Sequence, residues 1–518
     1  MKRLIILLLC ALMLLGSPAA LAEETVIVLG ESITVNGEEI TENPEEAVHL
    51  VRQTETHGDV PAELAGLENR VVTITRGGVY RLSGAATDVQ IAVRATEEDD
   101  VRLILDGVDI TCRTSSAIAV YSAHDPRTAG VYAVTLELAE GSVNRITGSH
   151  TVRIQESDVK LDGAVCSLVS LGIEGDGSMT VDADNEGIEV KFGHMTINGG
   201  VLDIRSGDDP LNVSEDGVGV LTMNDGYVFS EVKNAPGGEG DGIDSNGWIV
   251  FNGGTAINLA HPTSPDSGID SDMGSIINGG VIVGAGNMYD PIDAASEQLF
   301  MMLEFAESTD DLLVVTDQAG QPVFAYDFPH DYQYIAFSTP ALKAGERYSV
   351  YLGGQIEGEE HNGLYTTITA YIPGRQMTHG EGNAQQSMRG MPGGFDPMAG
   401  MEPPQGGTDP FGALAAIDLN EILKDADLNE VLRDVDLNDL LTGVAITDLL
   451  TEEQIRQYLG DVDVTALSGM QRGRGGDRGG FGGGFGGMRG LESSAAEATT
   501  AFLLTPDTTG FTNVRTAE

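Results

Sequence analysis

Short apolar runs separated by glycine, asparagine or aspartate follow one another from Val71 to about residue 295. Within the runs apolar and polar residues alternate, as in Met195 to Ile197 and Leu202 to Ile204. A period of two is typical of a β-strand with one buried face, and the residues between the runs are those that form turns. The pattern therefore predicts many short strands and an all-β fold.

A four-residue pattern recurs in the middle of this region: an acidic or polar residue, Gly or Pro, Ile or Leu, then an acid or amide. Its copies are Glu186–Glu189, Asp209–Asn212, Asp241–Asp244, Ser267–Asp270 and Asp290–Asp293. A second signal, Asn followed by Gly-Gly or Asp-Gly, keeps the same spacing and marks a corner where glycine can adopt a positive φ. Two interleaved signals at one period predict stacked coils of three strands each, a right-handed parallel β-helix.

The rest of the chain divides by composition. Longer runs that hold many of the aromatic residues occupy residues 296–375 and predict a small antiparallel β domain that caps the open end of the repeat. Residues 376–518 are a low-complexity tail, in which a nine-residue repeat from Asp418 predicts short capped helices around residues 417–460. The expected division is a signal at 1–22, a leader region at 23–70, the β-helix at 71–295, the cap at 296–375 and the tail at 376–518.

Residues 1–22 combine Lys2-Arg3, an apolar run and the small residues Ala20 and Ala22 around Leu21, which is the pattern of a cleaved secretory signal. The run is too short for a membrane span and no second one follows, so we expect a secreted, extracellular protein, either free or associated with a cell surface. Cys112 and Cys166 are expected as two buried thiols rather than a disulfide. Nothing in the pattern predicts an oligomer, and we expect a monomer.

The charge narrows the choice of partners. The chain has 28 Lys and Arg residues against 80 Asp and Glu residues, a formal net charge of -52. Such a chain would be repelled by the phosphates of nucleic acid, which argues against that partner. A strong negative field instead favours binding of cations.

Stacking the coils aligns the acidic residues of the repeat in columns. Carboxylates one coil apart would lie about 5 Å from each other and repel by about 3 kcal/mol at an effective dielectric constant of about 20. Ca²⁺, which takes about six to eight oxygen ligands, would relieve this repulsion, whereas a solvated acidic ridge is the alternative. The candidate metal ligands are Asp208, Asp209, Asp241, Asp244, Asp266, Asp270, Asp272 and Asp293, with the coils around Asp241 to Asp270 as the preferred place.

The segments Ile74–Gly84, Val101–Thr111 and Asp241–Asp244 together resemble a family of secreted calcium-dependent carbohydrate-binding β-helix proteins, first described from cellulose-degrading clostridia. The fold of that family is similar to the fold of pectate and polysaccharide lyases. The resemblance covers about residues 71–372 and implies calcium ions on the helix and binding of cellulose and polygalacturonate. Pro210, Pro291, Ser267 and Asn212 depart from the repeat, so fewer metal sites are expected here.

Three functions follow from these features. The favoured one is binding of a plant-type polysaccharide without catalysis, with Trp248, Tyr227 and Tyr289 as candidate sugar contacts. Trp248 is predicted to point outward because it alternates with Ile249 and Phe251, although it could instead cover a coil edge or a loop. The second function is a calcium-dependent pectate lyase, for which Lys191 is the weak candidate base and a salt bridge its alternative role. The third is a structural surface adhesin whose tail attaches to its target.

Overall fold

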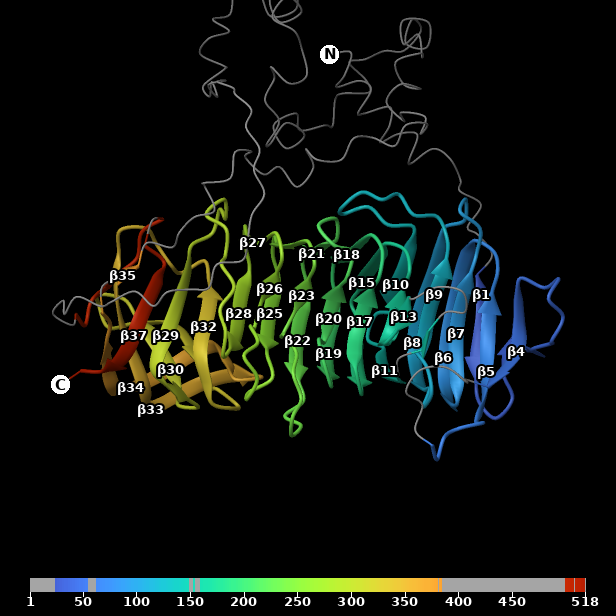
Figure 1. The fold of residues 1–518 in the computed structure, drawn as a ribbon, viewed down its shortest axis with the longest axis horizontal. Helices are drawn as coiled ribbons and strands as arrows, with labels where there is room; N and C mark the ends of the chain where they lie inside the picture. The colour runs from blue at the N-terminus through green and yellow to red at the C-terminus, as the bar shows by residue number, and fades with distance from the viewer. Residues whose placement is uncertain are drawn as a thin grey trace, which may run out of the picture. The chain divides into compact units, whose positions relative to one another are not determined.

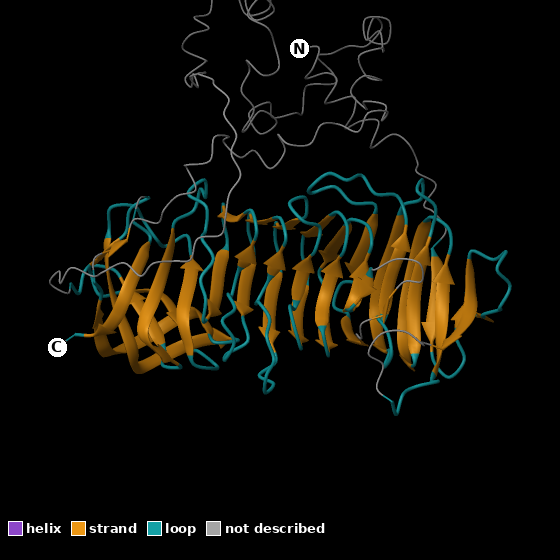
Figure 2. Ribbon diagram, in the orientation of Figure 1, coloured by secondary structure: helices purple, strands orange, loops and turns teal. Residues whose placement is uncertain are grey.

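The computed structural model describes residues 24–54, 62–148, 152–153, 159–380, 382–383, 499–506 and 508–517. These residues form strands and loops without a helix, which confirms the all-β prediction (Figure 2). The predicted secretory signal and the predicted helices around 417–460 lie outside the described residues. Within the described ranges, no helix is long and apolar enough to cross a membrane. Cys112 and Cys166 are both buried, and neither forms a disulfide.

Three ladders of strands run through the repeat region, and in each of them neighbouring strands pair in parallel (Figure 1). The first ladder contains β7 (Val89–Arg94), β9 (Ile118–Ser122), β14 (Gly163–Ser167), β17 (Glu186–Val190), β20 (Leu211–Val213), β23 (Asp244–Ser245) and β26 (Asp270–Ser271). The second contains β10 (Val134–Leu138), β15 (Leu171–Gly175), β18 (His194–Ile197), β21 (Val220–Met223), β24 (Trp248–Phe251) and β27 (Gly274–Ile277). The third contains β11 (Val143–Gly148), β16 (Ser178–Ala183), β19 (Val201–Ser206), β22 (Tyr227–Val232), β25 (Thr255–Leu259) and β28 (Val281–Gly286).

Each sequence repeat contributes one strand to each ladder, so the chain returns to the first ladder one row further on. Strands β17, β18 and β19 make one row, and β20, β21 and β22 make the next. The register keeps equivalent residues side by side, with Glu189 opposite Asn212, Met195 opposite Leu221 and Leu202 opposite Val228. The columns expected from stacked repeats therefore exist in the structure.

The alternation within each strand separates core from surface. The predicted inward residues of one row all lie in a single hydrophobic cluster that continues through the rows: Ile188, Met195, Ile197, Leu202 and Ile204. Gly268 lies where the first ladder meets the third, and a Cβ at this position would be 2.1 Å from the backbone nitrogen of Ala285. Only glycine allows this close approach in the Ser267–Asp270 copy of the repeat.

The asparagines of the corner signal form a continuous ladder of side-chain hydrogen bonds. Asn224 donates to Asn198 at 2.7 Å, Asn252 donates to Asn224 at 2.8 Å and Asn278 donates to Asn252 at 2.8 Å. Asn198 in turn donates to the hydroxyl of Tyr132 at 2.6 Å. Each side-chain amide thus donates a hydrogen bond to the amide oxygen of the preceding row, and these bonds fix the spacing of the corners.

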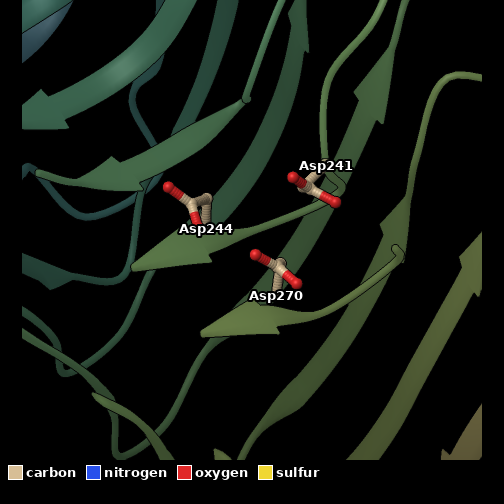
Figure 3. A group of neighbouring side chains, drawn as sticks. All are labelled: Asp241, Asp244 and Asp270. Atoms are coloured by element: carbon tan, nitrogen blue, oxygen red, sulfur yellow. The ribbon is translucent and has the colours of Figure 1, made fainter. Parts of the chain in front are cut away.

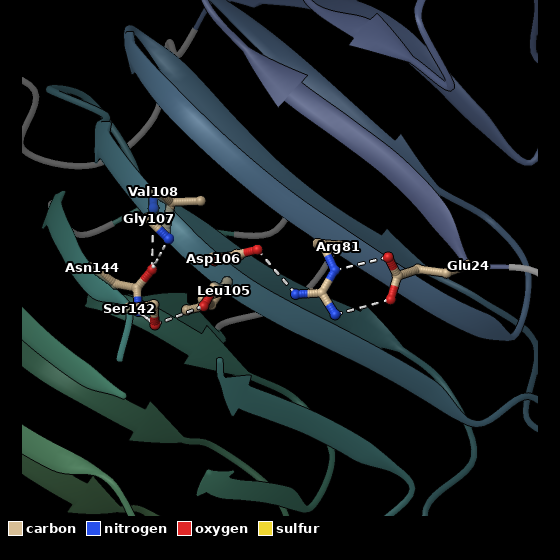
Figure 4. A network of polar contacts seen from close by, with 8 residues as sticks. All are labelled: Glu24, Arg81, Leu105, Asp106, Gly107, Val108, Ser142 and Asn144. Atoms are coloured by element: carbon tan, nitrogen blue, oxygen red, sulfur yellow. Dashed lines mark hydrogen bonds and ion pairs between the residues drawn. The ribbon is translucent and has the colours of Figure 1, made fainter. Parts of the chain in front are cut away.

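The first rows are built by longer strands. β1 (Thr25–Leu29) pairs in parallel with β6 (Gly78–Thr87), and β6 with β8 (Val101–Thr111), beside the small strands β2 (Thr34–Val35) and β3 (Glu38–Glu39). β8 bends at Gly107, which has a φ of 77°, and then continues from the second ladder into the third. Figure 4 shows the bend: the side-chain Oδ1 of Asn144 accepts hydrogen bonds from the backbone nitrogens of Gly107 and Val108. An Arg81 side chain between Glu24 and Asp106 ties β1 to the same place.

Two hairpins complete this end and the side of the repeat. β4 (Val48–Thr54) and β5 (Glu68–Ile74) are antiparallel, and β5 then pairs in parallel with β7. The short strands β12 (Val152–Arg153) and β13 (Lys160–Leu161) form the second antiparallel pair.

The predicted cap is an antiparallel β unit that joins the end of the third ladder, where β28 pairs with β32. Its strands are β29 (Phe300–Thr309), β30 (Leu313–Thr316), β31 (Pro322–Tyr326), β32 (Tyr332–Ser338), β33 (Arg347–His361) and β34 (Leu364–Thr378). It also packs sideways on the outer face of that ladder, where Phe229, Ile257 and Val283 join its hydrophobic cluster. The unit therefore continues the third ladder and also packs against the side of that ladder.

Residues from the end of the chain complete this unit. β37 (Gly510–Thr516) pairs in parallel with β29 and antiparallel with β34 and with the short β35 (Gly382–Asn383). β36 (Phe502–Leu503) pairs with β33. Phe502 and Phe511 are buried in the cluster of the cap, so this part of the predicted tail belongs to the packed structure.

Candidate metal site

Three aspartates of neighbouring rows meet at the edge of the first ladder. Asp244 in β23 lies directly opposite Asp270 in β26, and Asp241 precedes β23 by three residues. One carboxylate oxygen from each side chain lies within 4.8 Å of the other two, and Figure 3 shows the three carboxylates turned toward one space. Calcium binds oxygens at about 2.3 to 2.6 Å, so oxygens of one shell are separated by no more than about 5 Å. The three aspartates fit that requirement.

Backbone hydrogen bonds hold Asp241 in place. The backbone nitrogen of Ser267 donates to Oδ1 of Asp241 at 2.6 Å, and the backbone nitrogen of Asp241 donates to Oδ1 of Asp209 at 2.7 Å. The acid of one row thus accepts a hydrogen bond from the corresponding residue of the next row. Asp241 is fixed on both sides, which orients its carboxylate without a basic side chain.

The surroundings disfavour negative charge on all three groups at once. Burial, followed by the charge of Asp270, raises the pKa of Asp241 to about 8. Burial and the charges of Asp270 and Asp272 raise the pKa of Asp244 to about 7. Burial and Asp272 also raise the pKa of Asp270. These carboxylates either share protons near neutral pH or need a cation, because like charges at this separation repel by about 3 kcal/mol.

The other predicted ligands lie around these three aspartates in different roles. Asp209 is buried beside Asn212, which donates to it at 3.2 Å, and Asp266 accepts a hydrogen bond from the backbone of Gly240 at 2.7 Å. Asp208 is half-buried, and its pKa is raised to about 6 by burial and by Glu239 and Asp266. These side chains extend the negative field beyond the three aspartates that meet.

Two further predicted ligands differ from the expected column. Asp272 is exposed, and it acts on the site only through its charge. Asp293 does not continue the column of Asp244 and Asp270. The preceding residue, Ile292, forms an isolated parallel bridge with Ser275 of the second ladder instead of pairing with the first ladder. The carboxylate of Asp293 instead accepts a hydrogen bond from Ala295 within its own turn, at 2.6 Å. The last copy of the repeat therefore leaves the register at the end of the ladder.

Two acids outside the predicted set also belong to this edge. Asp290 accepts hydrogen bonds from the backbone and hydroxyl of Ser271, and burial with the charge of Asp270 raises its pKa to about 7. Glu186 is buried one row before Asp209, and its Oε2 has no hydrogen-bond partner among the described residues. Both stand in the column before Gly or Pro, so the repeat pattern was the signal that could identify them.

Lys191 lies in an ion-pair network rather than beside the three aspartates. Its Nζ is 2.7 Å from Asp162 and also contacts Glu189. Burial lowers the pKa of Lys191, but the charges of Glu189 and Asp162 outweigh burial and hold the pKa above its ordinary value. A lysine that keeps its proton so firmly is a poor base near neutral pH.

The predicted aromatic contacts are less accessible than expected. Trp248 points away from the main core, as the alternation predicts, but it is only 8% exposed and packs with Val220, Val250 and Ile276. Of the two predicted positions, the structure therefore shows the covered one, in which Ala129 from a loop distant in sequence packs against the group. Tyr227 is half-buried, with its ring 4.7 Å from that of His361.

Tyr289 lines a small pocket together with Asp290, Tyr334 and Met288. Burial raises the pKa of its hydroxyl above the ordinary value. The pocket lies between the last rows of the repeat and β32, so Tyr289 is a wall residue rather than an exposed platform.

Comparison with known proteins gives two matches of the same description. Residues 68–298, which is less than half of the chain, match a family described as "Carbohydrate-binding domain-containing protein". A protein of Acetivibrio thermocellus with that same description is 32% identical over 142 residues, which are 27% of this chain and 46% of that protein. The match thus spans about half of the relative's length. No solved structure matches the chain.

Proposed function

We propose that this chain is a secreted carbohydrate-binding protein whose binding region is the repeat at residues 68–298. The observation that carries the proposal is the family match, which covers this region and bears that description. The three parallel ladders are interpreted as the sides of a right-handed parallel β-helix. Rows of strands about 4.8 Å apart offer a long and regular surface to an extended polysaccharide.

Calcium at Asp241, Asp244 and Asp270 is the second part of the proposal. Three carboxylates whose oxygens lie within 4.8 Å, with pKa values raised by burial and by neighbouring carboxylates, are a donor set that suits calcium. Calcium would allow all three side chains to be ionised together, and it would supply a positive charge at an otherwise negative edge.

The same charge argument favours an acidic polysaccharide over a neutral one. Stacking of a neutral glucan needs open aromatic faces, but Trp248 is covered and Tyr227 is engaged with His361 and Asn362. An acidic chain such as polygalacturonate can instead place its carboxylates on bound calcium. We therefore propose polygalacturonate as the target and cellulose as the alternative target.

Lyase activity is the second candidate function, because calcium and an acidic glycan are also the requirements of that reaction. Its weak point is the base, since Lys191 is held by Asp162 and Glu189. An assay for unsaturated uronides in the presence of calcium tests this function. Turnover that is lost in Lys191→Ala would establish it and displace binding as the sole role.

Co-sedimentation with insoluble glycans tests the main proposal. We expect the protein to sediment with polygalacturonate gel in calcium and to stay in solution in EDTA, with Asp270→Asn weakening the interaction. Asp293→Asn is the matched control, because its carboxylate caps its own turn. Sedimentation that is equal in calcium and EDTA would refute the role of calcium, and failure to sediment with either glycan would refute carbohydrate binding.

A further inference from the structure

The loop between β9 and β10, residues 123–133, covers part of the outer surface of the second ladder (Figure 1). We name it the strap. Ala129 of the strap packs against the apolar group of Val220, Trp248, Val250 and Ile276, which belongs to β21, β24 and β27. The strap thus reaches rows of the repeat that lie about a hundred residues further along the chain.

Ionic and polar contacts hold the strap at its middle. Arg127 contacts Glu215 at 2.5 Å, and Asp125 at 3.8 Å. Glu215, in the loop between β20 and β21, also accepts a hydrogen bond from the backbone of Gly193 at 2.5 Å. At the start of the strap, His124 also contacts Asp100 at 3.0 Å. The attachment therefore rests on ion pairs that are partly open to solvent.

A histidine lies beneath this attachment. His194 is 1% exposed and stands opposite Val220, which in turn stands opposite Trp248, so the three side chains share one outward column. Neither ring nitrogen of His194 makes a hydrogen bond of ordinary geometry within the described part of the chain. Burial away from water favours the neutral form of this imidazole.

The charges around His194 come from two elements. Asp125 and Arg127 belong to the strap and Glu215 to the loop between β20 and β21, while the neighbouring Ser170 offers only a hydroxyl, which binds the backbone of His194. Burial has the largest effect and lowers the pKa of His194. The backbone of Arg127 raises this pKa and the charge of Arg127 lowers it, while the charges of Asp125 and Glu215 raise it by less than burial lowers it. The closed strap thus binds a proton at His194 less readily than an open strap would.

We propose that the strap is an acid-released cover: protonation of His194 favours an open strap and exposes Trp248 together with its apolar neighbours. The closed form loses stability as the pH falls below about 6.5, the ordinary value for histidine, because the open form takes up the proton more readily. The inference rests on the strap contacts and does not depend on calcium or on the proposed glycan.

Fluorescence can report this movement directly, because Trp248 is the only tryptophan of the chain. The full chain, in excess calcium, is titrated from about pH 8 to about pH 5, a range that spans the ordinary pKa of histidine. We expect the emission of Trp248 to shift to longer wavelength and its quenching by acrylamide to rise several-fold. Far-UV circular dichroism should remain unchanged, which separates opening of the strap from unfolding.

Two variants decide the cause. His194→Gln removes the titrating group, so its emission should not change over the same pH range. Arg127→Ala removes the ion pair to Glu215, so quenching should already be raised at pH 8. A pH-independent emission in the wild type, or an unaltered pH response in His194→Gln, would overturn the proposal. If His194→Gln does not fold, the proposal would be overturned by Arg127→Ala instead, should acrylamide quench this variant at pH 8 no more than it quenches the wild type.

Discussion

Calcium-free protein should lose stability as the pH rises from about 4 to about 8. The groups responsible are Asp241 and Asp244, whose folded-state pKa values are raised to about 8 and about 7 from an ordinary value of 3.8. The folded chain therefore holds protons there that the unfolded chain has already released. Their contribution is fully present below the unfolded pKa and is lost as the pH rises through the folded pKa.

The size of the effect follows from the shift. For Asp244 the difference between about 7 and 3.8 is about 3 units, and each unit corresponds to about 1.4 kcal/mol, which gives an upper limit of about 4 kcal/mol. Asp244 is only half-buried, so its carboxylate can turn toward water, and we expect about 2 kcal/mol. Calcium should cancel this loss, because a cation replaces the shared protons.

Chemical denaturation at several pH values, with EDTA or with calcium, measures this loss. Because other acids also titrate, the relevant quantity is the difference between the wild type and Asp244→Asn. In EDTA the variant should gain about 2 kcal/mol over the wild type between pH 4 and pH 8, and in calcium it should be the less stable of the two. Asp293→Asn should follow the wild type throughout. A difference that is independent of pH in EDTA, or unchanged by calcium, would refute the reasoning.

Three further predictions concern the frame around the site. Gly268→Ala should lower the free energy of unfolding by about 2 kcal/mol or more, since the new Cβ meets the backbone at Ala285, and urea denaturation would show it. Lys191→Met should lower the free energy of unfolding at pH 8 by about 3 kcal/mol in urea denaturation, because Glu189 stays buried without its ion-pair partner. At pH 6 the loss should be smaller, because Glu189 can take up a proton. Asn252→Ala should lower stability by about 1 to 2 kcal/mol in thermal denaturation by breaking two bonds of the amide ladder; no loss would show that backbone pairing alone fixes the corners.

The acidic column shows how far periodicity carries. Asp244 and Asp270 occupy equivalent positions in successive repeats, and the parallel register places them directly opposite each other. The same reasoning failed for Asp293, because the last row bridges through Ile292 and Ser275. A repeat predicts contacts between its interior rows, but the end of a ladder lacks a following row to hold its register.

Trp248 marks the boundary between local and tertiary information. Its alternation with Ile249 and Phe251 correctly predicts that the indole points away from the main core. Whether an outward side chain is exposed depends on what lies over it, and here that is a loop from far earlier in the chain. The packing of the cap against Phe229, and the burial of Phe511 in the same cluster, likewise depend on segments that are distant in sequence.

The sequence by itself determined the all-β class, the row-by-row repeat, the inward residues and the acids that stand in one column, because each depends on residues close in sequence or on one fixed period. The tertiary structure decided which acids meet, which lysine is held in ion pairs and which aromatic ring is covered. Those outcomes depend on contacts between segments that share no period. These contacts decide how far each group is buried, and burial in turn shifts its pKa.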